Sequence, residues 1–123
     1  MHVEGIKRMV DKQLAHGKKE EEIKKHEIAE LFKERSRVHI IVHGKVHGVF
    51  YRDYAKQQAD KLGITGWVKN IDDAVEIIAE GDKMKLREFI VLCEKGSPLA
   101  TVDTLDYDWE DYTGKFEKFY IHY

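Results

Sequence analysis

The sequence predicts an α/β (α+β) sandwich of the split βαβ, or ferredoxin-like, type, with one extra C-terminal strand and an N-terminal helical extension. Two observations predict this fold. From about residue 37, strand-like and helix-like hydrophobic patterns follow one another in the order strand, helix, strand, strand, helix, strand, strand. In addition, 123 residues with a hydrophobic content of 42% are enough for one domain with one core.

The first strand, the first helix and the central strand pair follow from the apolar pattern. An apolar run predicts a strand at residues 38–43. Apolar positions at helical spacing predict a helix at residues 51–62, which Gly63 ends. Two further strands are predicted at residues 64–69 and 75–80, joined by a tight turn.

The second half of the domain repeats the helix and adds two strands. Apolar residues at helical spacing predict a helix at residues 83–94, and Gly96 and Pro98 stop it. Strands are predicted at residues 101–109 and 116–123. The last of them is extra to the split βαβ unit, and we expect it to complete the sheet.

Residues 1–36 differ in composition from the rest and form a predicted helical extension. They contain nine Lys/Arg and eight Asp/Glu residues and show no strand-like alternation. Short apolar stripes predict two helices, with Gly17 as a C-cap of the first. Because an isolated helix pair of this kind is marginally stable, we expect it to dock on the main domain, residues 37–123, or on a second copy. Self-association through this extension is therefore one expectation.

The overall composition excludes several classes of protein. A formal net charge of −2 gives no bulk electrostatic reason to bind nucleic acid. No apolar run reaches membrane-spanning length, and the N-terminus has no signal-peptide pattern. The only cysteine, Cys93, excludes an internal disulfide and fits a reducing cytoplasm. It lies on the apolar stripe of the second helix, so we expect a packing residue and not a nucleophile.

The loop between the first strand and the first helix predicts a phosphate-binding site. Residues 44–52 read Gly-Lys-Val-His-Gly-Val-Phe-Tyr-Arg. Two glycines between a strand and a helix allow backbone N–H groups to converge on an anion, and the helix N-terminus adds partial positive charge there. Arg52, in the first helical turn, adds a planar fork of donors suited to phosphate.

The same loop resembles the first signature of the acylphosphatase family, which reads Gly-x-Val-x-Gly-Val, then two large residues and an arginine. Residues 66–70, Gly-Trp-Val-Lys-Asn, resemble the family's second signature at the expected distance. Residues 80–81 and 95–102 resemble later landmarks. The resemblance covers about residues 37–123, and two motifs in the right order make it specific.

This resemblance implies an enzyme that hydrolyses the carboxyl-phosphate bond of acyl phosphates without a metal ion or cofactor. The implied partners are a small-molecule acyl phosphate and inorganic phosphate. Arg52 and Asn70 are the implied catalytic residues: Arg52 would hold the phosphoryl oxygens, and Asn70 would orient the attacking water. The implied phosphate-binding residues are His47, Gly48, Val49, Phe50, Tyr51 and Arg52.

The same residues also have simpler interpretations. Arg52 could be a solvated surface residue, and Asn70 could serve only the turn before the next strand. A non-catalytic ferredoxin-like module that binds an anion or a protein is therefore an alternative, as is an assembly unit driven by its helical extension. We expect Trp67 to be a core or site-wall residue, and Phe50 and Tyr51 to be packing residues.

Histidines and one turn depart from the simplest picture. The histidines at positions 39, 43 and 122 could share one face, but no cysteine or carboxylate spacing supports a metal site. His47 stands where the family usually has glutamine, and an imidazole beside phosphate could affect the pH profile. After Asn70, residues 71–75 lack the family's glycine and are one residue shorter, which predicts a shift of the Asn70 side chain.

Overall fold

The computed structural model describes residues 33–123, of which Glu34–Tyr123 form one compact unit. The two helices predicted for the N-terminal extension lie almost entirely outside the described residues. The elements follow one another in the predicted order: β1 (Arg35–Lys45), α3 (Tyr51–Leu62), β2 (Thr65–Ile71), β3 (Ala74–Asp82), α4 (Lys83–Lys95), β4 (Thr101–Glu110) and β5 (Phe119–His122).

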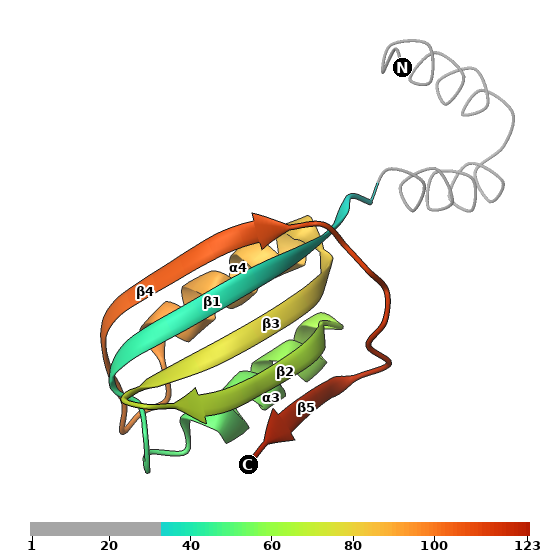
Figure 1. The fold of residues 1–123 in the computed structure, drawn as a ribbon. Helices are drawn as coiled ribbons and strands as arrows, with labels where there is room; N and C mark the ends of the chain where they lie inside the picture. Colours follow the sequence, from blue (N-terminus) through green and yellow to red (C-terminus); the bar gives the residue numbers. More distant parts are fainter. Residues whose placement is uncertain (1–32) are drawn as a thin grey trace, which may run out of the picture. The chain divides into compact units, whose positions relative to one another are not determined.

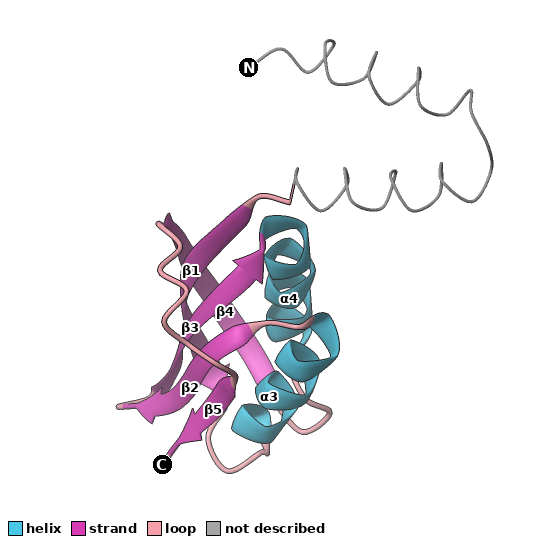
Figure 2. Cartoon of the chain, turned by 90° about the vertical axis from the view of Figure 1, so that its right-hand side faces the viewer, coloured by secondary structure: helices cyan, strands magenta, loops and turns pink. Residues whose placement is uncertain are grey.

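The strands form a single five-stranded sheet in the order β4-β1-β3-β2-β5 (Figure 1). β1 pairs antiparallel with β3 and β4, β2 pairs antiparallel with β3, and β5 adds to β2 in parallel. Both helices pack on the same face of the sheet (Figure 2), and no helix among residues 33–123 covers the other face. This arrangement confirms the predicted ferredoxin-like fold with an extra C-terminal strand.

The core lies between the sheet and the two helices, as the alternation in β1 requires. Val38, Ile40 and Val42 are fully buried, whereas the residues between them are partly exposed. The helices contribute residues one turn apart, Tyr51, Ala55 and Ala59 from α3 and Leu86, Phe89 and Cys93 from α4. No helix among residues 33–123 is long and apolar enough to cross a membrane.

The starts of β1 and β5 each differ by three residues from the sequence prediction, and the other strand boundaries differ by at most two. β1 begins at Arg35, so the last two residues assigned to the N-terminal extension belong to the sheet. β5 begins at Phe119 and not at residue 116. The physical reason is the fully buried carboxylate of Glu80, which accepts hydrogen bonds from the backbone N–H groups of Thr113 and Gly114. This holds the segment that connects the two edge strands, β4 and β5, in an irregular path.

The prediction that Trp67 belongs to the core or to a site wall is wrong. In β2, the buried residues Gly66 and Val68 face the helices, so Trp67 between them faces the opposite side of the sheet. There its ring stacks on the imidazole of His122, with 5.4 Å between the ring centroids. The tryptophan therefore covers the outer face where β5 joins β2.

Candidate active site

The loop after β1 is anchored to the body of the domain at three points. Val46 and Val49 are 1% and 5% exposed and pack into the core. In the segment after the second helix, the buried hydroxyl of Ser97 donates a 3.0 Å hydrogen bond to the carbonyl oxygen of Val49. Gly44, which precedes the loop, has φ 135°, and a Cβ atom there would overlap the carbonyl oxygen of Thr101. The loop path is therefore closely determined.

The start of α3 presents unpaired backbone donors. Phe50 is the N-cap residue and has no side-chain cap, and the first helical hydrogen bond runs from Tyr54 N to Phe50 O at 3.0 Å. Within residues 33–123, the backbone N–H groups from His47 to Asp53 have no hydrogen-bond acceptor. Unpaired donors at a helix N-terminus, together with the helix dipole, favour an anion at this position.

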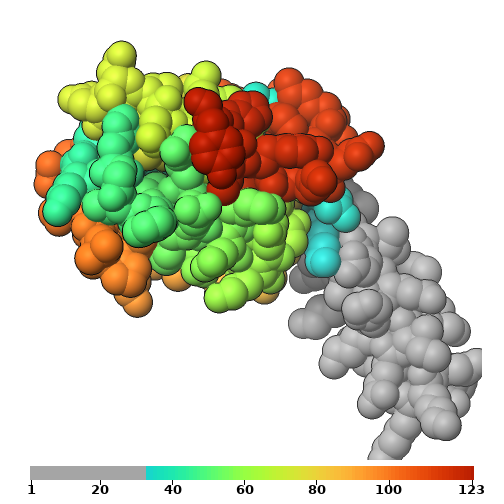
Figure 3. Space-filling model, turned by 90° about the horizontal axis from the view of Figure 1, so that it is seen from below, coloured from blue at the N-terminus to red at the C-terminus, as the bar shows by residue number. Residues whose placement is uncertain are grey.

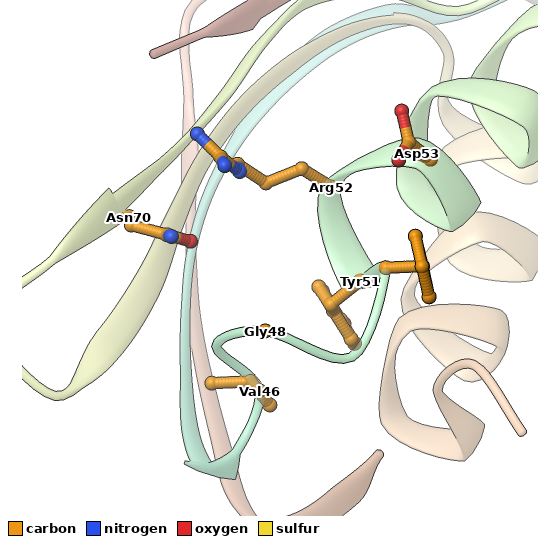
Figure 4. A pocket seen from close by; sticks show the side chains of 7 residues that line it. Val46, Gly48, Tyr51, Arg52, Asp53 and Asn70 are labelled. Atoms are coloured by element: carbon orange, nitrogen blue, oxygen red, sulfur yellow. The ribbon is translucent and has the colours of Figure 1, made fainter. Parts of the chain in front are cut away.

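The loop, α3 and β2 surround a pocket of about 250 Å³. Figure 4 shows that Arg52 extends from α3 toward Asn70 on β2, so the two predicted catalytic side chains face each other across the pocket. Asp53 points away from both of them. The lining residues are Val46, Gly48, Phe50, Tyr51, Arg52, Asp53 and Asn70.

The last strand holds the Arg52 side chain. Its Nη1 donates a 3.1 Å hydrogen bond to the carbonyl oxygen of His122, and its guanidinium lies 4.8 Å from the centroid of the Tyr123 ring. Figure 3 accordingly shows the C-terminal residues, in dark red, beside the green residues that begin α3. Because a guanidinium carries five N–H donors, the bond to His122 leaves the others available to a ligand.

Asn70 is positioned by the register of the β2–β3 hairpin. It pairs with Val75, and the ladder continues through Ile71 and Ala74 to a two-residue turn. Asp72 takes the positive φ of 36° that a tight turn requires, which glycine would otherwise supply. Asn70 lines the same pocket as Arg52, and the shift that the shortened turn predicts for its side chain stays a prediction.

The structure brings together most, but not all, of the predicted site residues. Four predicted phosphate-binding residues line the pocket: Gly48, Phe50, Tyr51 and Arg52. The side chains of His47 and Val49 do not, because the imidazole turns to the carbonyl oxygen of Ala74 and the valine packs into the core. Sequence reasoning missed Val46 and Asp53 as lining residues. Both flank the predicted segment, and that proximity was the only available signal.

Phe50 corrects another prediction. We expected a packing residue, but its side chain is 71% exposed. The cause is its left-handed backbone conformation, with φ 61° and ψ 26°, which is costly for a bulky residue and turns the ring outward at the pocket rim.

The ionisable groups behind the pocket are held neutral. Burial raises the pKa of the Cys93 thiol to about 12, even though the hydrogen bond from Tyr51 lowers it. Burial likewise raises the pKa of Tyr51, whose hydroxyl donates a 2.6 Å hydrogen bond to the carbonyl oxygen of Cys93. Neither group can serve as a nucleophile or base, and the prediction that Cys93 is a packing residue is confirmed.

The described residues contain no cluster of three or more His, Cys, Asp or Glu side chains that could hold a metal ion. Two of the three histidines considered in the sequence, His39 and His122, have other partners. Nε2 of His39 lies 2.7 Å from the carboxylate of Glu76, and His122 stacks on Trp67.

Comparison with known proteins agrees with these features. The acylphosphatase family model matches residues 38–121. The acylphosphatase of Pelotomaculum thermopropionicum is 42% identical over 88 residues, covering 71% of this chain and 96% of the relative. The acylphosphatase of Methylococcus capsulatus is 44% identical over 86 residues, covering 69% and 94%. The crystal structure of acylphosphatase from Bacillus subtilis superposes with a TM-score of 0.69 at 37% identity, covering 72% of this chain and 99% of that one.

Proposed function

Because this chain belongs to the acylphosphatase family and hydrolyses acyl phosphates, we propose that Arg52, Asn70 and the backbone N–H groups at the start of α3 carry out the reaction. These roles are supported by the way in which three kinds of polar group meet at one site. Unpaired backbone donors, a guanidinium and an amide side chain, from segments distant in sequence, border one pocket. Each matches a different requirement of phosphoryl transfer.

In this mechanism the phosphoryl group lies at the N-terminus of α3. Its oxygens accept hydrogen bonds from the backbone N–H groups of residues 47–51 and from the free N–H groups of Arg52. These donors are fixed before substrate arrives, so they stabilise the charge of the transition state without reorganisation. The helix dipole acts in the same direction.

Asn70 orients the attacking water. Its side-chain oxygen accepts a hydrogen bond from the water, whose oxygen then bonds to phosphorus as the bond between phosphorus and the acyl oxygen breaks. The acyl group leaves as a carboxylate, and both protons of the water are retained by the phosphate product. Since a carboxylate is a weak base and a good leaving group, no strong general acid is required.

The exposed ring of Phe50 supplies an apolar rim on the substrate side of the pocket. We place the acyl group of the substrate against this ring, because the phosphoryl group occupies the donors deeper in the site. The contact would favour acyl groups with apolar surface over acetyl.

The experiment that tests these roles is steady-state hydrolysis of acetyl phosphate by the wild-type chain and by Arg52→Ala and Asn70→Ala, with inorganic phosphate as a competitive inhibitor. Hydrolysis should persist after treatment with a chelator and dialysis, because Arg52 and the backbone donors meet the charge of the phosphate. Loss of turnover after chelation, restored by one divalent ion, would show that the proposed site is incomplete.

The cellular setting and the N-terminal extension also belong to this proposal. The single, buried cysteine fits a cytoplasmic enzyme, and the net charge of −2 gives no reason for nucleic acid or membranes as partners. Residues 1–33 contribute no catalytic group and act in docking or self-association. Deleting them, while keeping Glu34, should preserve turnover and change the oligomeric state or the unfolding temperature. Loss of turnover by a folded truncated chain would refute this role.

A further inference from the structure

We infer that the side chain of His47 is a positioning residue, which ties the phosphate-binding loop to the β2–β3 hairpin and thereby places Asn70 relative to the bound phosphate. The inference rests on the proposed role of Asn70. His47 contacts no substrate atom through its side chain in this proposal. It acts through the hairpin.

The tie is a short hydrogen bond. Nε2 of His47 lies 2.6 Å from the carbonyl oxygen of Ala74, the first residue of β3 after the turn. A carbonyl oxygen can only accept, so Nε2 must carry the proton and donate. Nε2 is protonated both in this neutral tautomer and in the imidazolium ion, so the tie does not depend on the charge of the ring.

The hydrogen bond joins the phosphate-binding loop to the hairpin, two segments distant in sequence. The other loop anchors, Val46, Val49 and the Ser97 hydroxyl, fasten the loop to the core and to the residues after α4. Among residues 33–123, no other hydrogen bond connects the loop to the hairpin. Without the imidazole, the spacing between the loop and the hairpin would depend on the β1–β3 ladder alone.

Ala74 is close enough to the site for this spacing to matter. It pairs across the hairpin with Ile71, the residue that follows Asn70. A shift of Ala74 therefore moves the strand that carries Asn70. Since a displacement of about 1 Å in a positioning group can lower the rate by up to about 10²-fold, a single tie at this place can affect turnover without touching phosphate.

The length of the side chain decides which residues could replace His47 in this hydrogen bond. In glutamine, the amide nitrogen lies the same number of bonds from Cβ as Nε2 does in histidine, whereas in asparagine it lies one bond closer. Glutamine can therefore reach the carbonyl oxygen of Ala74, and asparagine cannot.

This difference in reach gives a matched pair of variants, His47→Gln and His47→Asn. We would measure kcat for acetyl phosphate and the inhibition constant of inorganic phosphate. His47→Asn and His47→Ala should lower kcat about tenfold, and His47→Gln should restore it to within about threefold of wild type. The inhibition constant should change less than about twofold in all three variants, because the loop donors and Arg52 remain in place.

A double-mutant cycle with Asn70→Ala tests whether His47 acts through Asn70. In the Asn70→Ala background, His47→Asn should produce no further loss of kcat. His43→Ala serves as the control, because His43 pairs with Ala74 in the β1–β3 ladder and makes no side-chain hydrogen bond among residues 33–123. It should leave kcat near the wild-type value. Thermal unfolding confirms that each variant is folded.

Three results would overturn the inference. The first is a wild-type kcat for His47→Asn alongside a collapsed kcat for Asn70→Ala, which would refute the tie alone. The second is a parallel loss of phosphate binding and kcat, or an equal loss in both backgrounds, which would show that His47 shapes the loop instead. The third is a wild-type kcat for Asn70→Ala, which would refute the proposed role of Asn70 and this inference with it.

Discussion

The loop that binds phosphate and the hairpin that carries Asn70 form opposite walls of one pocket, and they are held in different ways. The loop wall is one continuous segment. Val46 and Val49 pack into the core, and the carbonyl oxygen of Val49 accepts a hydrogen bond from Ser97. The hairpin wall contributes one exposed side chain, placed by strand register and by a two-residue turn. The position of the loop wall is therefore fixed by its own contacts with the core, whereas the position of the Asn70 side chain depends on contacts elsewhere in the sheet.

This difference separates binding from chemistry. Donors for the phosphoryl group come mainly from the backbone, which no single side-chain replacement removes. The water-orienting group is a single amide. We therefore expect substitutions that alter the donors of the loop wall or its anchors in the core to change phosphate affinity. Substitutions that remove or displace the Asn70 amide, including those at His47, should change kcat.

The largest effect should follow removal of the guanidinium, because Arg52 belongs to the loop wall and also faces the hairpin. Arg52→Ala should weaken inhibition by inorganic phosphate and lower turnover about 10²–10³-fold. Arg52→Lys keeps the charge without the planar fork and should give an intermediate loss. Phosphate inhibition equal to wild type in a folded Arg52→Ala variant would remove Arg52 from the site.

Asn70→Ala should distinguish most clearly between the effect of the hairpin wall on kcat and the effect of the loop wall on phosphate binding. We expect kcat to fall about 10–10²-fold while inhibition by inorganic phosphate remains unchanged, since the loop and Arg52 are intact. Asn70→Asp should also be poor, because its carboxylate repels the bound phosphoryl group despite being the better base. An Asn70→Ala variant with wild-type turnover would mean that another group orients the water.

Ser97→Ala should affect only the loop wall. The carbonyl oxygen of Val49 then loses its partner, which destabilises the fold by about 1–3 kcal/mol, and phosphate inhibition should weaken several-fold. Ser36→Ala is the matched control. The buried hydroxyl of Ser36 also donates to a carbonyl oxygen, that of Glu110, but Ser36 lies at the opposite end of β1 from the loop. Equal effects of both variants on phosphate inhibition would show that Ser97 does not shape the loop.

The smallest effect should come from Phe50→Gly. Glycine adopts φ 61° without strain, so the free energy of unfolding should stay the same or rise by up to about 1 kcal/mol, although an exposed aromatic ring is lost. The ratio of kcat/KM for benzoyl phosphate to that for acetyl phosphate should fall a few-fold. Phe50→Leu, which keeps the strain, should lower the ratio without stabilising. An unchanged ratio in both variants would place the acyl group elsewhere.

The fold and the loop wall could be predicted because their causes are local. A strand, two glycines, a helix start and Arg52 lie within one short segment, and α3 begins and ends at the predicted residues. The position of Asn70 could be predicted only as a resemblance, because the effect of the short turn depends on whether Asp72 accepts a positive φ.

The remaining errors have non-local causes. The start of β5 is set by Glu80, a charged residue whose complete burial and bonding to Thr113 and Gly114 cannot be read from periodicity. Phe50 is apolar, but its left-handed backbone directs it to solvent. The partner of His47 lies on the β2–β3 hairpin, a segment distant in sequence.

The parallel pairing of β5 with β2 has a consequence for how the protein loses activity and aggregates on heating. The same short strand covers the hydrogen-bonding edge of β2 and supplies the carbonyl oxygen that holds Arg52. Fraying of β5 would at once release the arginine and expose an edge on which another chain can add a strand. We therefore expect inactivation under mild heating to coincide with the first step of aggregation, before the sheet and helices unfold.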